Sequence, residues 1–241
     1  MYLRGVHMSV PTLPTGPTVD LAQAAERLIK GRRAVRAFRP DEVPEETMRA
    51  VFELAGHAPS NSNTQPWHVE VVSGAARDRL AEALVTAHAE ERVTVDFPYR
   101  EGLFQGVLQE RRADFGSRLY AALGIARDQT DLLQGYNTES LRFYGAPHVA
   151  MLFAPNNTEA RIAGDMGIYA QTLMLAMTAH GIASCPQALL SFYADTVRAE
   201  LGVENRKLLM GISFGYADDT AAVNGVRIPR AGLSETTRFS R

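Results

Sequence analysis

The sequence has little of what several classes of protein depend on. It holds one cysteine, so no disulfide can form within the chain, and we expect a reducing, cytoplasmic location. No apolar run approaches the roughly 18 residues of a membrane span. A general nucleic-acid binder is strongly basic, whereas the formal net charge of this chain is -2. We therefore expect a soluble protein with neither membrane nor nucleic acid as a partner.

Familiar catalytic and metal-binding motifs are also missing. The chain has no H-E-x-x-H, no paired cysteines and no G-x-G-x-x-G, and its six histidines are dispersed, so we expect no metal site. Residues 211–215 match the hydrolase pattern G-x-S-x-G. A nucleophile elbow should open a helix and precede the catalytic histidine, yet polar residues follow and no histidine occurs after His180. We reject the hydrolase interpretation.

Two short segments carry most of the functional information. Arg32, Arg33 and Arg36 form a cationic cluster suited to phosphate. Because only two of the 25 basic residues are lysines, arginine clusters also arise by chance, and this one is weak evidence alone. Residues 59–67, Pro-Ser-Asn-Ser-Asn-Thr-Gln-Pro-Trp, form an uncharged turn rich in amides and hydroxyls, which suits a flat, neutral, hydrogen-bonding ring. Together the segments suggest flavin mononucleotide (FMN).

Hydrophobic periodicity predicts a single domain over residues 18–241, with helices around a small central sheet. Residues 1–17 are expected to be a flexible leader and 218–241 an extended arm. Helices are expected over 20–30, from Pro44 until Pro59 closes the helix, and over 75–91, 102–122, 127–142, 162–180 and 192–201. Strands are expected over 67–72, 149–153 and 208–216. The aromatic residues between 92 and 145 permit two interpretations, packing between helices or a lid over an aromatic ligand.

Several motifs, in this order, resemble those of the FMN-dependent nitroreductase family. They cover nearly everything after about residue 25: Arg32-Arg33-x-x-Arg36-x-Phe38, Ala58-Pro59-Ser60, Asn63-x-Gln65-Pro66-Trp67, Asp165-Met166-Gly167, Cys185-Pro186-Gln187, Gly215-Tyr216-Ala217-Asp218 and Arg227-x-Pro229-Arg230. The resemblance implies an α+β fold with a central, mainly antiparallel sheet flanked by helices. It also implies a homodimer with two FMN sites at the interface, in which each C-terminal arm wraps the partner.

The resemblance further implies roles for individual residues. Arginines at 32, 33, 36, 227 and 230 would surround the FMN phosphate, with Arg36 also the candidate cation beside the ring edge. Ala34 stands where the family commonly has serine or threonine, which removes one hydroxyl contact. The remaining contacts would come from Pro59, Ser60, Asn61 and Asn63 of the partner subunit, and from Pro186, Gln187, Ala188 and Leu189, with a backbone N–H of Ala188 or Leu189 directed at the flavin N5. Trp67 and Cys185 are expected to be packing residues.

The implied activity is oxidoreduction in which NADPH or NADH reduces FMN, which then reduces a small aromatic acceptor. Nitroaromatics would pass through nitroso to hydroxylamine in two-electron steps, and quinones are the other acceptor class. Because donor and acceptor would share one ring face, a ping-pong cycle is expected, without a dedicated acid–base pair. Alternatives are an FMN-consuming enzyme, a reductive dehalogenase, an azoline oxidase and a flavin-binding module without turnover.

Overall fold

A four-stranded antiparallel sheet forms the centre of the computed structural model, which describes residues 20–100, 102–126 and 128–241. The predicted leader, 1–17, lies outside the described residues. Strand order is β1-β2-β4-β3, and the strands are β1 (His68–Ser73), β2 (His148–Pro155), β3 (Ala183–Gln187) and β4 (Arg206–Gly215). All three pairings are antiparallel, which confirms the expected fold class.

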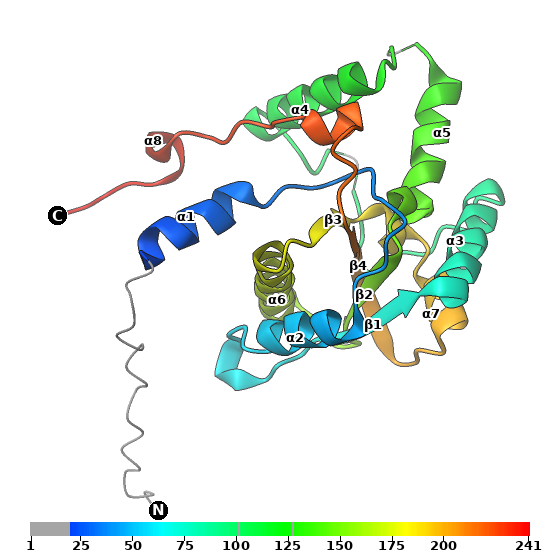
Figure 1. Cartoon of the computed structure of the whole chain (residues 1–241), viewed down its shortest axis with the longest axis horizontal. Helices are drawn as coiled ribbons and strands as arrows, with labels where there is room; N and C mark the ends of the chain where they lie inside the picture. Colours follow the sequence, from blue (N-terminus) through cyan, green and yellow to red (C-terminus); the bar gives the residue numbers. More distant parts are fainter. Residues whose placement is uncertain (1–19, 101, 127) are drawn as a thin grey trace, which may run out of the picture.

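Helices cover both faces of this sheet (Figure 1). One face packs against α2 (Glu45–Ala55) and α6 (Ala160–Ala179), through Ala150, Leu152 and Ile212 of the sheet. The opposite face, which carries Val149, Met151 and Phe153, packs against α3 (Gly74–Ala89), α5 (Thr130–Leu141) and α7 (Ala194–Leu201). Strand β2 is therefore apolar along nearly its whole length, as expected of a strand buried on two sides.

The predicted helices are present with shifted ends, whereas strand β3 was missed. This strand is five residues long and contains Pro186, which weakens any strand pattern. Because β3 is the edge strand of the sheet, with β4 as its one neighbouring strand, the missing N–H of proline breaks no central ladder. The sequence-predicted helices near 102–122 and 192–201 begin later, as α4 (Val107–Leu123) and α7, and the latter follows the short helix η3 (Leu189–Phe192).

Helix α1 (Leu21–Gly31) and the C-terminal arm lie outside the two helical layers (Figure 1). Asp20 caps α1 by accepting from two backbone N–H groups, and the helix runs to Gly31, immediately before the arginine cluster. The arm contains the short helices η4 (Ala222–Gly225) and α8 (Leu233–Thr236) and is otherwise extended. An ion pair of 3.1 Å between Arg111 and Glu235 ties the arm to α4.

Most aromatic side chains between 92 and 145 pack against other side chains of the same subunit. Phe143 is fully buried, and the ring of Tyr136 lies between Tyr120 and Tyr144, with centroids 6.3 and 5.7 Å away. The packing interpretation is therefore supported for these rings. Within the described residues, no helix is long and apolar enough to cross a membrane.

Buried His148 joins three parts of the fold in its neutral form. Its Nε2 accepts from the Val43 N–H at 2.9 Å, and its Nδ1 lies 2.5 Å from Ser73 Oγ. Since Nε2 must accept, Nδ1 carries the proton and donates to Ser73. Burial lowers the pKa of His148, and the smaller influence of Glu42 acts in the opposite direction.

We predict that His148 makes the protein less stable in mild acid. A histidine pKa lower in the folded than in the unfolded chain adds stability above about pH 6.5, which is lost as the pH falls through the folded value. Urea unfolding at pH 7.5 and pH 5.0 should show this loss, at most about 1.4 kcal/mol per pH unit. The variant His148→Gln should flatten the slope, and the control His57→Gln, at an exposed position, should not. An unchanged slope in His148→Gln would contradict the assignment.

Candidate functional site

The arginine cluster lies in a cavity of about 500 Å³ formed by segments far apart in the sequence. These segments are the end of α1, the extended chain after it, helix α4 and the start of the C-terminal arm. The lining residues are Ile29, Lys30, Arg32, Arg33, Ala34, Arg36, Phe115, Val226, Arg227, Ile228 and Arg230. The structure therefore gathers every arginine that the sequence analysis selected, and adds Phe115 as an aromatic wall.

The cavity is strongly cationic. Arg33 forms an ion pair of 3.2 Å with Asp219, whereas no carboxylate of the described residues pairs with the guanidinium groups at 32, 36, 227 and 230. Burial lowers the pKa of Arg32, and the nearby charge of Arg230 lowers it further. Like charges gathered without a counter-ion favour binding of an anion, and guanidinium groups match phosphate oxygens well. The residues present therefore fit a phosphate-bearing cofactor.

Backbone hydrogen bonds place the arginine cluster beside the edge of the sheet. Ala34 forms a parallel bridge with Ser184 of β3, and the Val35 N–H donates to the Ser184 carbonyl at 3.0 Å. The guanidinium of Arg36 lies over the Phe115 ring, 5.3 Å from its centroid. The Arg36 N–H donates to the side chain of Asn224, a residue that the sequence analysis missed because an isolated asparagine in an irregular arm carries no pattern.

The polar turn is built by a contact with helix α6. The Asn61 N–H lies 3.1 Å from both carboxylate oxygens of Asp165. Ser62, Asn63 and Gln65 have positive φ angles of 53°, 56° and 44°, which cost free energy at residues other than glycine. The turn lies beside α2, whereas the segments that line the arginine cavity, namely the end of α1, helix α4 and the start of the arm, lie in the other half of the view (Figure 1). Within one chain, the structure does not bring the two together.

Residues 186–189 form the end of β3 and the start of η3. The Gln187 side chain is buried, and its amide nitrogen donates to the Ser140 carbonyl at 2.7 Å and to Ser140 Oγ at 3.0 Å. Its amide oxygen accepts from Ser213 Oγ. The carboxamide of Gln187 is therefore engaged inside the protein, so a ligand contact from this residue would use its backbone.

The packing roles predicted for individual residues agree with the structure. Cys185 is 1% exposed, and burial raises the pKa of its thiol to about 11. Trp67 stacks on Tyr169 with ring centroids 4.8 Å apart. Ser213, the serine of the G-x-S-x-G match, is buried within strand β4 rather than exposed at a turn into a helix. Rejection of the hydrolase interpretation is thus confirmed.

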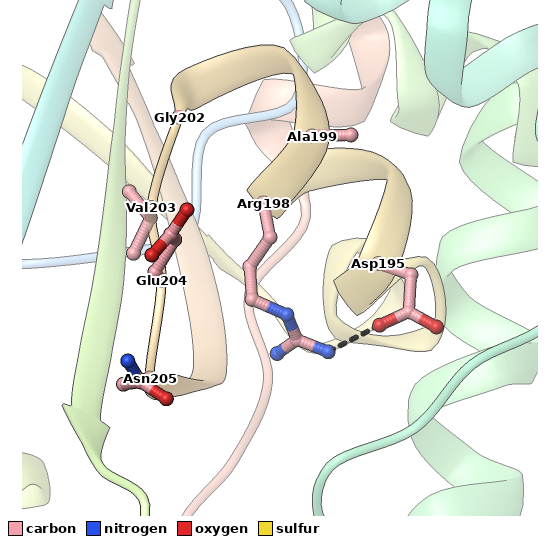
Figure 2. A pocket seen from close by; sticks show the side chains of 7 residues that line it. All are labelled: Asp195, Arg198, Ala199, Gly202, Val203, Glu204 and Asn205. Atoms are coloured by element: carbon pink, nitrogen blue, oxygen red, sulfur yellow. Dashed lines mark hydrogen bonds and ion pairs between the residues drawn. The ribbon is translucent and has the colours of Figure 1, made fainter.

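A second hollow lies between α7 and β4, where Figure 2 shows Arg198 directed at Asp195. Arg198 pairs with both Asp195 and Asp96, and it also donates to the Arg206 carbonyl at 3.1 Å. Since two carboxylates already neutralise this guanidinium, the hollow does not attract an anion. No group of three potential metal-binding side chains occurs in the parts of the chain that the structure describes.

A four-stranded antiparallel sheet between helices, with an arginine-lined cavity at its edge, defines an α+β protein suited to a phosphate-bearing ligand. Residues 29–216 match the model of the nitroreductase family. The chain belongs to the nitroreductase family. Membership confirms the family and the fold predicted from the motifs, and it makes the protein an oxidoreductase.

Several characterised proteins resemble this chain over most of its length. The 4-nitrobenzoate reductase of Nocardioides sp. (strain LMS-CY) is 34% identical over 81% of this chain and 81% of its own. The chloronitrobenzene nitroreductase of Comamonas testosteroni is 31% identical over 94% of this chain and 99% of its own. Among solved structures, the FMN and NADPH-dependent nitroreductase NfnB from Sphigopyxis sp. strain HMH has a TM-score of 0.86 and 35% identity, covering 90% of this chain and 99% of that one.

Proposed function

We propose that this protein is an FMN-dependent reductase that uses NAD(P)H to reduce nitroaromatic compounds, with quinones as further acceptors. The cavity with four guanidinium groups that lack a carboxylate partner among the described residues carries the proposal, because it matches the charge of an FMN phosphate. The relatives support the reaction, since two of them are named for reduction of nitrobenzoate and chloronitrobenzene. NADPH and NADH both remain candidate donors, and NfnB is named for NADPH.

Half-buried Arg32 and exposed Arg230 are the proposed principal phosphate contacts. Their mutual repulsion would be relieved by a dianion between them, so binding of the phosphate gains free energy from both charges. Arg227 and Arg33 add positive charge at the rim. Because Ala34 offers no hydroxyl, the phosphate depends on guanidinium groups and backbone donors.

When bound, FMN supplies the two-electron exchange between NAD(P)H and the acceptor. The protein contributes charge and orientation. Arg36, half-buried and held over Phe115, is positioned to favour negative charge on a neighbouring ring. Leu189 opens helix η3, and the first N–H groups of a helix have no partner within it. A backbone donor from Ala188 or Leu189 is therefore available to orient the ring without a titratable side chain.

The proposal includes a homodimer in which the polar turn of one subunit completes the cavity of the other. Three features support it: the turn lies far from the cavity of its own chain, no residue of α1 is buried, and the arm exposes large apolar side chains. Leu21 and Ile29 of α1 are each 59% exposed, and Phe239 of the arm is 76% exposed. A second copy would cover this apolar surface. A cytoplasmic location, favoured by the single cysteine, belongs to the same proposal.

Stopped-flow spectroscopy tests the proposed reaction. Anaerobic mixing of purified protein with NADPH or NADH should bleach the flavin absorbance, and later addition of 4-nitrobenzoate should restore it. Parallel lines in double-reciprocal steady-state plots are expected, because donor and acceptor use the same ring face in turn. Intersecting lines would require a ternary complex and contradict the shared face, and a flavin that NAD(P)H does not reduce would favour a binding module.

Removal of the principal guanidinium groups should weaken cofactor retention. Each charge-assisted hydrogen bond contributes about 1.5–3 kcal/mol, so Arg32→Ala/Arg230→Ala should raise the FMN dissociation constant at least about 100-fold. Flavin fluorescence after titration with FMN measures this change. The matched control Arg79→Ala/Arg92→Ala removes two exposed charges that do not line the cavity and should retain wild-type affinity. Full flavination of the double variant would overturn the phosphate assignment.

Mixed dimers test whether the polar turn acts on the partner subunit. We expect Arg32→Ala/Arg230→Ala and Asn61→Ala/Asn63→Ala each to lose flavin as homodimers. In a dimer with one copy of each variant, one of the two sites would have intact arginines and an intact turn, so about half of the wild-type flavin should return. If each site were completed within one chain, both sites of the mixed dimer would be defective and flavin would stay absent.

A further inference from the structure

The side chain of Asn224 bonds to the two segments that carry the arginines of the cavity. Asn224 lies in helix η4 and is 3% exposed. Its amide oxygen accepts from the Arg36 N–H at 2.8 Å. Its amide nitrogen donates to the carbonyls of Ala37 and Asp218, both also at 2.8 Å. Every one of these partners is backbone, so the carboxamide fixes the path of the chain.

The geometry accepts a carboxamide in one orientation. The Arg36 N–H is a donor, and the carbonyls of Ala37 and Asp218 are acceptors. If the amide were reversed, its nitrogen would face the N–H and its oxygen would face both carbonyls, and all three hydrogen bonds would be lost. An aspartate would provide the acceptor for Arg36 but would oppose its second oxygen to two carbonyls. Because a buried, fully paired polar group is costly to disturb, the chemistry at this position is narrowly defined.

The backbone of Asn224 also reaches the other half of the cationic cavity. Its carbonyl accepts from Nη1 of Arg227 at 3.0 Å. Asn224 therefore contacts the backbone of Arg36, which is 188 residues away in the sequence, and the side chain of Arg227, which is 3 residues away. Helix η4, which contains Asn224, also packs against α4, and α4 supplies Phe115 to the lining of the cavity.

Like charges oppose the assembly of this cavity. The charge of Arg230 lowers the pKa of Arg32, so before an anion binds, the arm and the segment after α1 repel each other. Neutral hydrogen bonds buried beside the arginines hold the two segments together without neutralising the positive charge that a phosphate needs. An ion pair between the two segments would hold them too, but its carboxylate would compete with the ligand for the guanidinium groups.

We propose that Asn224 is a positioning residue that holds the segment of Arg32 and Arg36 in register with the arm that carries Arg227 and Arg230, and thereby sets the affinity of the cavity for the phosphate end of the flavin. It does so through these arginines, without touching the cofactor. This inference rests on the proposed function. It goes beyond it by assigning part of the cofactor affinity to a residue of the arm outside the lining of the cavity.

Comparison of FMN with riboflavin, which lacks the phosphate, tests the proposal. Flavin-free protein, prepared from wild type, Asn224→Asp and Asn224→Ala, is titrated with each flavin. We expect the FMN dissociation constant to rise at least about tenfold in both variants, since two or more hydrogen bonds are lost. The riboflavin constant should rise by a clearly smaller factor, since of these arginines only Arg36 is assigned to the ring. Asn157→Asp, which makes the same change on an exposed turn, should match wild type with both flavins.

A double-mutant cycle provides the second measurement. If Asn224 acts through Arg227, the loss of FMN affinity caused by Asn224→Ala should be clearly smaller when Arg227→Ala is already present. Additive losses together with an equal fall in riboflavin affinity would identify general structural damage and overturn the proposal. Failure of both Asn224 variants to fold would assign the residue to the fold and would also overturn it.

Wild-type protein separates this proposal from the proposed function. If the wild type binds neither flavin, the proposed function fails, and the Asn224 proposal fails with it. If the wild type binds FMN more tightly than riboflavin but the Asn224 variants bind both flavins as the wild type does, the Asn224 assignment alone is wrong.

Discussion

Repulsion between guanidinium groups that have no carboxylate partner in the described structure is the constraint on which the site depends. Arg32 and Arg230 lie close enough for one charge to lower the pKa of the other. A protein tolerates such an arrangement when rigid surroundings enforce it and a bound anion relieves it. The enforcing elements here are the edge of the sheet, which holds residues 34 and 35 through Ser184, and the carboxamide of Asn224. The group of like charges is thus held in place by neutral contacts around it.

Rigidity at the cavity comes from a sheet buried on both faces. Strand β2 is apolar nearly throughout, and the strands beside it extend the two cores to β3. On one face the Gln187 carboxamide joins β3 to Ser213 of β4 and to Ser140 at the end of α5. Segment 186–189 is therefore fixed from inside the protein. In a site whose chemistry belongs to the cofactor, such fixation is the main contribution of the protein.

The separation of the polar turn from the arginines explains why a homodimer is part of the proposed function. Asp165 fixes the turn on α6, and Ser62 and Gln65 adopt strained positive φ angles in it. Helix α1 and the arm, which flank the arginines in the sequence, expose large apolar side chains. Cofactor binding and association of two copies would then be linked, and each would stabilise the other.

Local patterns were sufficient for the helices, three of the four strands, the fold class and the family. The spacing of apolar residues reflects which face of a helix or strand is buried, so it can be read from the sequence. The order of the family motifs can also be recognised without knowing which residues are in contact. Strand β3 was not predicted, because a short edge strand that contains a proline forms through its pairing with β4 rather than through a local sequence pattern. The internal hydrogen bonds of the Gln187 and Asn224 side chains could be found only from the tertiary structure. Gln187 bonds to Ser140, 47 residues away, and Asn224 bonds to Arg36, 188 residues away. Hydrogen bonds over such distances leave no periodic trace, so the sequence determined which arginines are candidates for the site, and tertiary contacts decided how they are gathered and held.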